Sequence, residues 1–197
     1  MKVYSFGQKI ALSAFVAGIS WFLYAYFFVI ARDTLVSSLM LTLAGLASLE
    51  VFVGLYIKLR DIDQGWALIA LLLGVAGTLG TAIHGAYDLA VALNPPLTIN
   101  VDLPNQVDPR GFLAFGLTGF ALLKISYLMW VGKKFTQNLS LLGFGSGVLL
   151  IIIYLGRLIV LNPAEPILKY PILIEGFLVN PLWYLWIGYL FWTKAKE

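Results

Sequence analysis

The sequence predicts an all-α integral membrane protein, built as a bundle of six transmembrane helices with both termini in the cytoplasm. The chain of 197 residues is 60% hydrophobic and 12% charged, about half of the charged fraction usual in a soluble domain. Six apolar windows are about as long as a membrane-crossing helix must be, and basic residues concentrate at one border of the predicted membrane. Because the spans take up most of the chain, we expect residues 1–197 to form a single transmembrane domain.

The six apolar windows define the expected topology. A helix needs about 20 mostly apolar residues to cross the hydrocarbon core of a bilayer. The windows cover residues 10–30, 35–57, 66–93, 112–131, 139–161 and 172–192. The first window is too long for the apolar part of a signal peptide and ends in ARDT, which is not a small-residue cleavage site. It is therefore predicted to be retained as a helix.

Basic residues set the orientation of the spans. Eight of them flank the borders on the side of the termini, and three flank the other side: Lys2, Lys9, Lys58, Arg60, Lys133, Lys134, Lys194 and Lys196 against Arg32, Arg110 and Lys169. The excess of basic residues marks the cytoplasmic side. An even number of spans independently requires the two termini to share a side. The chain is thus predicted to be a multi-pass protein of a bacterial-type cytoplasmic membrane.

The long outer loop differs in composition from the short basic inner loops. It spans residues 94–111, contains four prolines and carries Asp102, Asp108 and Arg110. Proline fixes the backbone dihedral φ, so the loop is expected to be a stiff cap over the outer end of the bundle.

Ionisable residues inside the predicted spans are the main candidates for a functional site, because a charge in hydrocarbon is costly. A helix rises about 1.5 Å per residue, which gives each residue an approximate depth. One group lies roughly 10 Å from the inner border, and the other occupies the outer half at depths of roughly 5 to 14 Å. The inner group is Glu50 and Lys124; the outer group is Arg157, Glu175, Asp88 and, deepest, His84.

Glu50 and Lys124 are predicted to form a structural ion pair between the second and fourth spans. They lie at the same depth, and neither charge is tolerated alone in lipid. The alternative is a role in proton transfer or substrate binding.

His84, the only histidine, precedes Asp88 by four residues, so the two share one helix face. Gly77, Thr81 and Gly85 lie on the same face, and small residues at this spacing let another helix approach closely. The face is therefore expected to point towards protein. One interpretation is purely structural, with His84 hydrogen-bonded to Asp88 or to a carbonyl inside a tight helix crossing.

The second interpretation makes this pair the floor of an outward-facing pocket. Asp88 and Glu175 outnumber Arg157 in the outer half, and an excess carboxylate there needs a protonated His84, a bound cation or water. Arg157 and Glu175 are expected at the mouth, with the 94–111 loop as a lid. The predicted ligand-binding residues are His84, Asp88, Arg157, Glu175, Asp102, Asp108 and Arg110.

Several classes of chemistry are excluded or unsupported by composition. The absence of cysteine removes disulfides, thiolate metal sites and cysteine nucleophiles. A single histidine excludes a bis-histidine haem within one chain, and no cluster of metal ligands is evident. Neither a cofactor nor a metal is expected, no catalytic residue is assigned, and the scattered basic residues do not predict nucleic-acid binding.

Three functions remain open. The leading one is binding or translocation of a small polar or charged solute in the outward-facing pocket. The six-helix plan with elaborated outer loops is similar to that of the substrate-binding subunits of energy-coupling-factor vitamin importers. The alternative is an accessory or structural subunit of a larger membrane complex, with no solvent path to His84. Its partner would pack on the small face of helix 1 or on the face of Gly143 and Gly147; the helix 1 face is Ser13, Ala14, Ala17 and Gly18.

The third function is an intramembrane enzyme that uses His84 as acid or base and Asp88 to orient it. No nucleophile accompanies this pair in the sequence. This leaves enzymatic activity the least supported of the three.

Overall fold

The computed structural model describes residues 4–94, 113–159 and 165–194, and every regular element in these ranges is a helix. Six continuous helical segments are long and apolar enough to cross a membrane, which confirms the predicted helical class and the predicted number of long apolar helices. In chain order the elements are α1 (Phe6–Ala25), the π-helical η1 (Tyr26–Ala31), α2 (Thr34–Leu59), α3 (Gln64–Leu93), α4 (Leu113–Gly132), α5 (Gln137–Ile159), α6 (Pro166–Ile174), the π-helical η2 (Glu175–Val179) and α7 (Asn180–Lys194).

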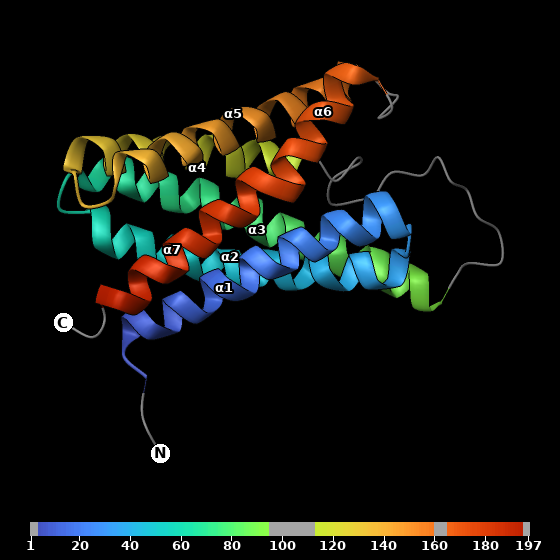
Figure 1. The fold of residues 1–197 in the computed structure, drawn as a ribbon, viewed down its shortest axis with the longest axis horizontal. Coiled ribbons are helices and arrows are strands. Elements are labelled where there is room, and N and C mark those ends of the chain that lie inside the picture. The colour runs from blue at the N-terminus through green and yellow to red at the C-terminus, as the bar shows by residue number, and fades with distance from the viewer. Residues whose placement is uncertain (1–3, 95–112, 160–164, 195–197) are drawn as a thin grey trace.

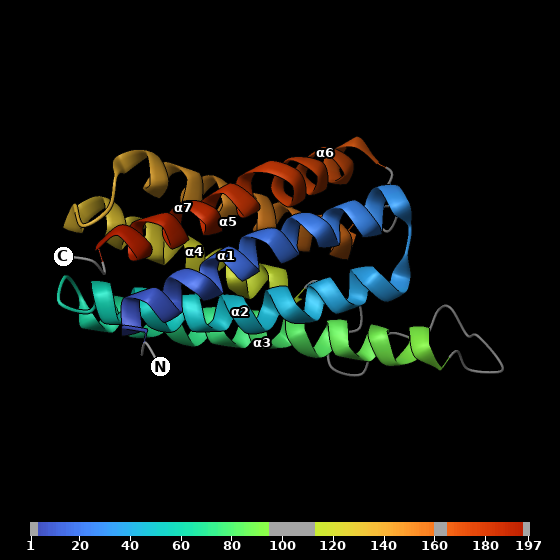
Figure 2. The same cartoon turned by 60° about the horizontal axis from the view of Figure 1, so that its bottom comes forward.

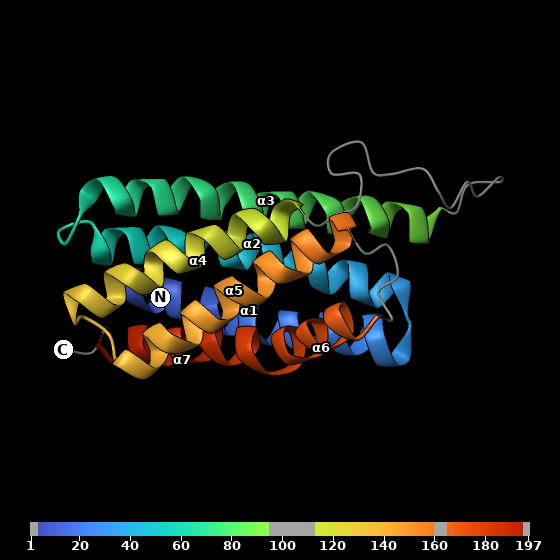
Figure 3. The same cartoon turned by 90° about the horizontal axis from the view of Figure 1, so that it is seen from above.

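The helices form a closed ring in which each packs on its neighbours in the sequence and α7 returns to pack on α1 (Figure 1). The beginning of α1 and the end of α7 lie at the same end of the bundle (Figure 2), as an even number of spans requires. At the opposite end α3, the longest helix, extends beyond the others (Figure 3). The side of the membrane that each end faces remains a prediction from the basic residues.

Side chains near the helix starts supply the missing backbone hydrogen bonds. Ser5 and Gln8 form a reciprocal capping box at α1, Asp33 accepts from the Val36 N–H at 3.0 Å, and Asp63 accepts from the Trp66 N–H at 2.9 Å. Such caps explain why α1, α2 and α3 begin before their apolar windows.

The two loops at the end that holds the termini are tied together by Lys134. Its ammonium donates to the Asp61 carboxylate and, at 3.0 Å, to the carbonyl of Lys58. The hydrogen bond from Lys134 holds the pKa of the Asp61 carboxyl below its ordinary value. Both loops are therefore anchored by a charge-assisted contact across the end of the ring.

The sixth span begins earlier than predicted, at Pro166 instead of residue 172. Proline is well suited to the first turn of a helix because its missing N–H would have no partner there. Later in the span, Pro181 cannot donate a backbone hydrogen bond, and the π-helical segment η2 directly precedes it. The earlier start changes the depth of every residue in this span.

Small residues let the helix backbones touch. A Cβ atom added to Gly85 of α3 would lie 2.6 Å from the Thr42 nitrogen of α2, and one added to Gly77 would meet Thr118 of α4. Thr81, between them, is buried. The predicted small face of α3 is thus turned to protein, against two helices at once.

The small faces that were predicted to receive a partner protein are covered within the chain. A Cβ on Gly147 would lie 2.8 Å from the Gly119 carbonyl of α4, and one on Gly143 would meet Ser126 and Trp183. In helix 1, Ala14 and Ala17 are fully buried, and Gly18 packs on α7. These faces are used largely to pack the ring itself, and docking of a partner protein through them stays a prediction.

Candidate functional site

His84 and Asp88 lie in the last third of α3. The distance from His84 Nε2 to Asp88 Oδ2 is 3.3 Å, and the side chains are 21% and 39% exposed. One helical turn separates them, so the contact follows directly from their spacing. Both line a cavity of about 220 Å³, and the two side chains are therefore accessible from a space inside the bundle.

This cavity, which we call the histidine cavity, is formed by α1 to α5. Its wall contains polar side chains from α2 and aromatic side chains from α1, η1 and α4. Ser37 and Ser38 donate their hydroxyl protons to the carbonyl of Thr34 at 3.1 and 2.6 Å, so their oxygens keep the capacity to accept. Besides His84 and Asp88, the lining residues are Tyr24, Phe28, Thr34, Ser37, Ser38, Leu41, Phe115 and Arg157.

A second cavity of about 150 Å³ adjoins the first, and we call it the aromatic cavity. The two share four lining residues: Tyr24, Phe28, Phe115 and Arg157. Glu175 lines the aromatic cavity together with Trp21 of α1 and Asn180 of α7. The structure thus gathers His84, Asp88, Arg157 and Glu175 around two adjoining spaces, and Arg157 borders both.

Glu175 does not lie at a mouth, as its predicted depth implied. It is 3% exposed, and the nine residues of α6 precede it, which puts it roughly 14 Å into the span instead of roughly 5 Å. Its Oε1 accepts the Ser146 hydroxyl proton at 2.5 Å, while Oε2 has no partner among the described residues. The prediction was wrong because the proline-containing stretch before residue 172 was taken for a loop.

The expected lid falls outside the described residues. Asp102, Asp108 and Arg110 lie between positions 95 and 112, so their relation to the two cavities remains a prediction.

The ion pair predicted between Glu50 and Lys124 is not formed. Glu50 accepts a hydrogen bond from Ser13 of α1 and is exposed, whereas the Lys124 ammonium lies over the Trp66 ring of α3, 3.6 Å from its centroid. Depth alone was insufficient evidence, because the two side chains leave α2 and α4 towards different neighbours. Lys124 is stabilised instead by a cation–π contact.

This difference predicts additive mutational effects. Glu50→Gln and Lys124→Met share no partner, so the change in the free energy of unfolding of the double variant should equal the sum of the two single changes within about 0.5 kcal/mol. The measurement is chemical unfolding of the four proteins in one detergent. A coupling well above this value would restore the ion pair.

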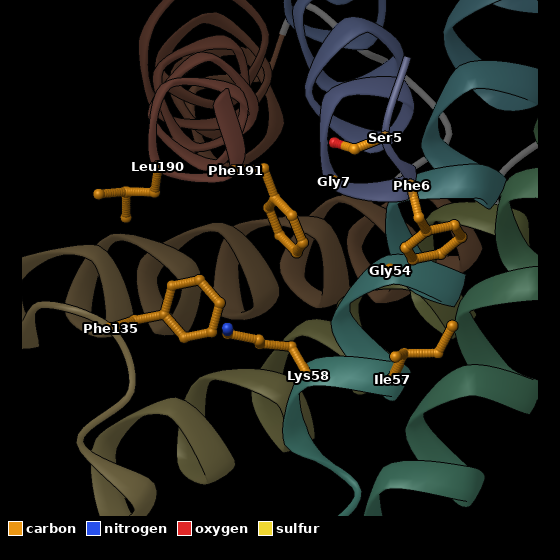
Figure 4. Close-up of a pocket in the computed structure, with 9 residues that line it drawn as sticks. All are labelled: Ser5, Phe6, Gly7, Gly54, Ile57, Lys58, Phe135, Leu190 and Phe191. Atoms are coloured by element: carbon orange, nitrogen blue, oxygen red, sulfur yellow. The ribbon is translucent and has the colours of Figure 1, made fainter. Parts of the chain in front are cut away.

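A larger pocket of about 390 Å³ lies at the end that holds the termini, between α1, α2, α7 and the loop before α5 (Figure 4). Its lining is mainly aromatic and aliphatic, and Lys58 points into it (Figure 4). Ser5 is already engaged in the capping box of α1. Since it brings together no set of polar groups that could orient a ligand, this pocket is the weaker candidate.

Neither cavity offers an evident metal site. Within the described ranges, no three His, Asp or Glu side chains come close enough to share an ion. The Asp88 carboxylate contacts the His84 imidazole, and the Glu175 carboxylate accepts the hydroxyl proton of Ser146.

The aromatic wall and Ser146 do not follow from the pattern of charged residues. Trp21, Tyr24 and Phe28 follow one another at spacings of three and four, which is the signal of one helix face. Phe115 comes from α4, far away in the sequence, and no pattern along the chain connects it to the other three.

These features describe a bundle of six helices, each long and apolar enough to cross a membrane, which encloses two small polar and aromatic cavities near one end of its ring and indicates a multi-pass membrane protein. No protein-family model, no characterised protein and no solved structure matches the chain significantly.

Proposed function

We propose that the protein binds a small polar or charged solute in the two cavities, as a receptor or carrier in a bacterial-type cytoplasmic membrane. The observation that carries the proposal is the gathering of His84, Asp88, Arg157 and Glu175 from three different helical segments around adjoining spaces. Glu175 is buried and one of its carboxyl oxygens has no described partner, which is costly unless something interacts with it in the cavity. At about 150 and 220 Å³, the cavities are smaller than pockets for drug-sized molecules, so the solute is small.

The orientation of the basic residues puts this end of the bundle outside the cytoplasm, so the site would open outwards. His84 and Asp88 are partly exposed and line a cavity, which favours solute binding. The accessory-subunit alternative predicts instead that no solvent path reaches His84. Ser37 and Ser38 line the histidine cavity, but both hydroxyls donate to the carbonyl of Thr34 instead of to a base, so neither is activated as the nucleophile of an enzyme would be.

Native mass spectrometry of the detergent-purified protein tests the proposal. A small molecule should co-purify with the wild type and be lost from Arg157→Met, because Arg157 lines both cavities; Asp88→Asn is a second, milder variant. Arg60→Met, an exposed change at the opposite end, is the matched control and should retain the molecule. Purification without a small molecule but with a stoichiometric protein partner would instead support the accessory-subunit function.

A further inference from the structure

The aromatic cavity is walled by rings in mutual contact. The centroid of Trp21 lies 5.9 Å from that of Tyr24 and 6.0 Å from that of Phe115, and Tyr24 stacks on Phe28 at 5.4 Å. Trp21 is further held by Ser48, whose oxygen accepts the indole N–H at 3.1 Å. Trp21 is therefore held in place before any ligand arrives, which lowers the entropy cost of binding, whereas Phe28 at the edge of the wall is 57% exposed.

The same cavity contains a carboxyl group with an open acceptor. Glu175 is almost completely buried, its Oε1 is bonded to Ser146, and Oε2 has no described partner. The two ion pairs between described residues are His84–Asp88 and Lys134–Asp61, and neither includes Glu175. Leaving such a group unsatisfied costs free energy, so Oε2 marks where the positive part of a ligand would lie.

A carboxylate beside several aromatic faces is suited to an ammonium group. An unmethylated ammonium group carries three N–H donors and needs about as many acceptors, whereas the described lining of this cavity offers two buried side-chain acceptors without a described partner, Glu175 Oε2 and Asn180 Oδ1, among its rings. A methylated ammonium group needs few acceptors and makes favourable contacts with aromatic faces through its polarised methyl groups. Arg157, on the wall that both cavities share, adds a positive charge that suits an anionic group on the same ligand.

The backbone next to the cavity is also unusual. Phe28 and Val29 belong to η1, and Glu175 and Gly176 belong to η2, so both π-helical segments of the described chain border this one space. Short π-helical insertions occur frequently at functional sites. They widen the helix at the positions where the carboxylate and one of the rings enter the wall.

We propose that the aromatic cavity binds the N-methylated ammonium group of a small zwitterion. Glu175 supplies the counter-charge, Trp21, Tyr24, Phe28 and Phe115 surround the methyl groups, and Arg157 receives the carboxylate of the ligand. This inference rests on the proposed function and specifies its substrate class. Binding is non-covalent and requires no proton transfer.

Isothermal titration calorimetry of the full chain in detergent tests the substrate class with glycine, sarcosine, dimethylglycine and glycine betaine. These probes share one carboxylate and one positive charge and differ only in methylation. Affinity should rise along the series by the size of a cation–π contact, about 2- to 30-fold in total. Equal or stronger binding of glycine would overturn the proposal, as would binding of none of the four.

Two substitutions test the roles proposed for the carboxylate and for one of the aromatic rings. Glu175→Gln keeps an acceptor for Ser146 but removes the charge, and should weaken glycine betaine binding by about 30-fold or more. Phe115→Leu should weaken it by about 2- to 30-fold. The exposed Glu165→Gln on α6 is the matched control and should leave binding unchanged. An unchanged affinity in Glu175→Gln would contradict the assignment, and Phe115→Leu still tests the site if Glu175→Gln does not fold.

A second pair of probes separates this inference from the proposed function. Arg157→Met should weaken glycine betaine but not tetramethylammonium, which has no carboxylate; equal weakening of both would refute the role given to Arg157. If all methylated probes fail while a different molecule co-purifies and is lost in Arg157→Met, the substrate class is wrong and solute binding still stands.

Discussion

Replacing Gly45 with alanine is expected to destabilise the protein by about 1 to 3 kcal/mol, although alanine is the better helix former. A Cβ at this position would lie 2.6 Å from the Ala82 nitrogen and 2.7 Å from the Thr78 carbonyl oxygen of α3. Both contacts are with backbone, so no side chain can rotate away and the two helices must separate. The measurement is the free energy of unfolding in one detergent.

Gly145→Ala in α5 is the matched control, because nothing lies within 4 Å of a Cβ added there. Helix propensity then acts alone, and the variant should be unchanged or more stable by up to about 1 kcal/mol. If glycine-to-alanine lowers the free energy of unfolding at position 45 but not at position 145, the close α2–α3 crossing is the cause of the loss, and not the replacement of a glycine as such. Similar effects at both positions would disprove the close crossing.

Ser146→Ala and Glu175→Met should change the stability of the ligand-free protein in opposite directions. Removing the Ser146 hydroxyl leaves both oxygens of the buried Glu175 without a described donor and should cost about 1 to 3 kcal/mol. Glu175→Met removes the poorly satisfied group itself, and the buried Ser146 hydroxyl can then donate to the carbonyl four residues earlier in α5, so the free energy of unfolding should rise by up to a similar amount.

The measurement is chemical unfolding of both variants beside the wild type, with Glu165→Met as an exposed control that should change stability by less than about 0.5 kcal/mol. A gain in stability on removal of Glu175 would indicate that the residue is kept for binding and not for folding. A loss in both variants would instead show that the carboxyl group holds α5 and η2 together.

The six spans could be predicted because hydropathy and length are local properties of the chain. Five windows agree with the helices within a few residues. The sixth failed at its beginning, since the apolar window starts at residue 172 and leaves Pro166 and Pro171 outside the span, whereas a proline at the first helical position has no hydrogen bond to lose. That error carried over into the depth of Glu175 and placed it at a mouth instead of in the interior.

The candidate site could be predicted only in its charged members. His84 and Asp88 share a face because of their spacing, and this contact is present. The pairing of Glu50 with Lys124 could not be decided from depth, because depth does not specify the direction in which a side chain leaves its helix. The aromatic wall was missed because Phe115 joins Trp21 only where side chains of α4 and α1 meet across the interior of the ring.

The sequence by itself determined what each helix could contribute: an apolar span, a stripe of small residues, and a few ionisable groups that lipid does not tolerate. Those properties depend on composition and on the period of the α-helix. Only the tertiary structure decided which face meets which neighbour. It directed Gly85 towards α2 and Gly77 towards α4, Lys124 towards Trp66, and Glu175 towards Ser146 beside the aromatic rings. The physical reason is that helices in lipid associate through close packing and hydrogen bonds between specific surfaces, and these depend on how the ring closes.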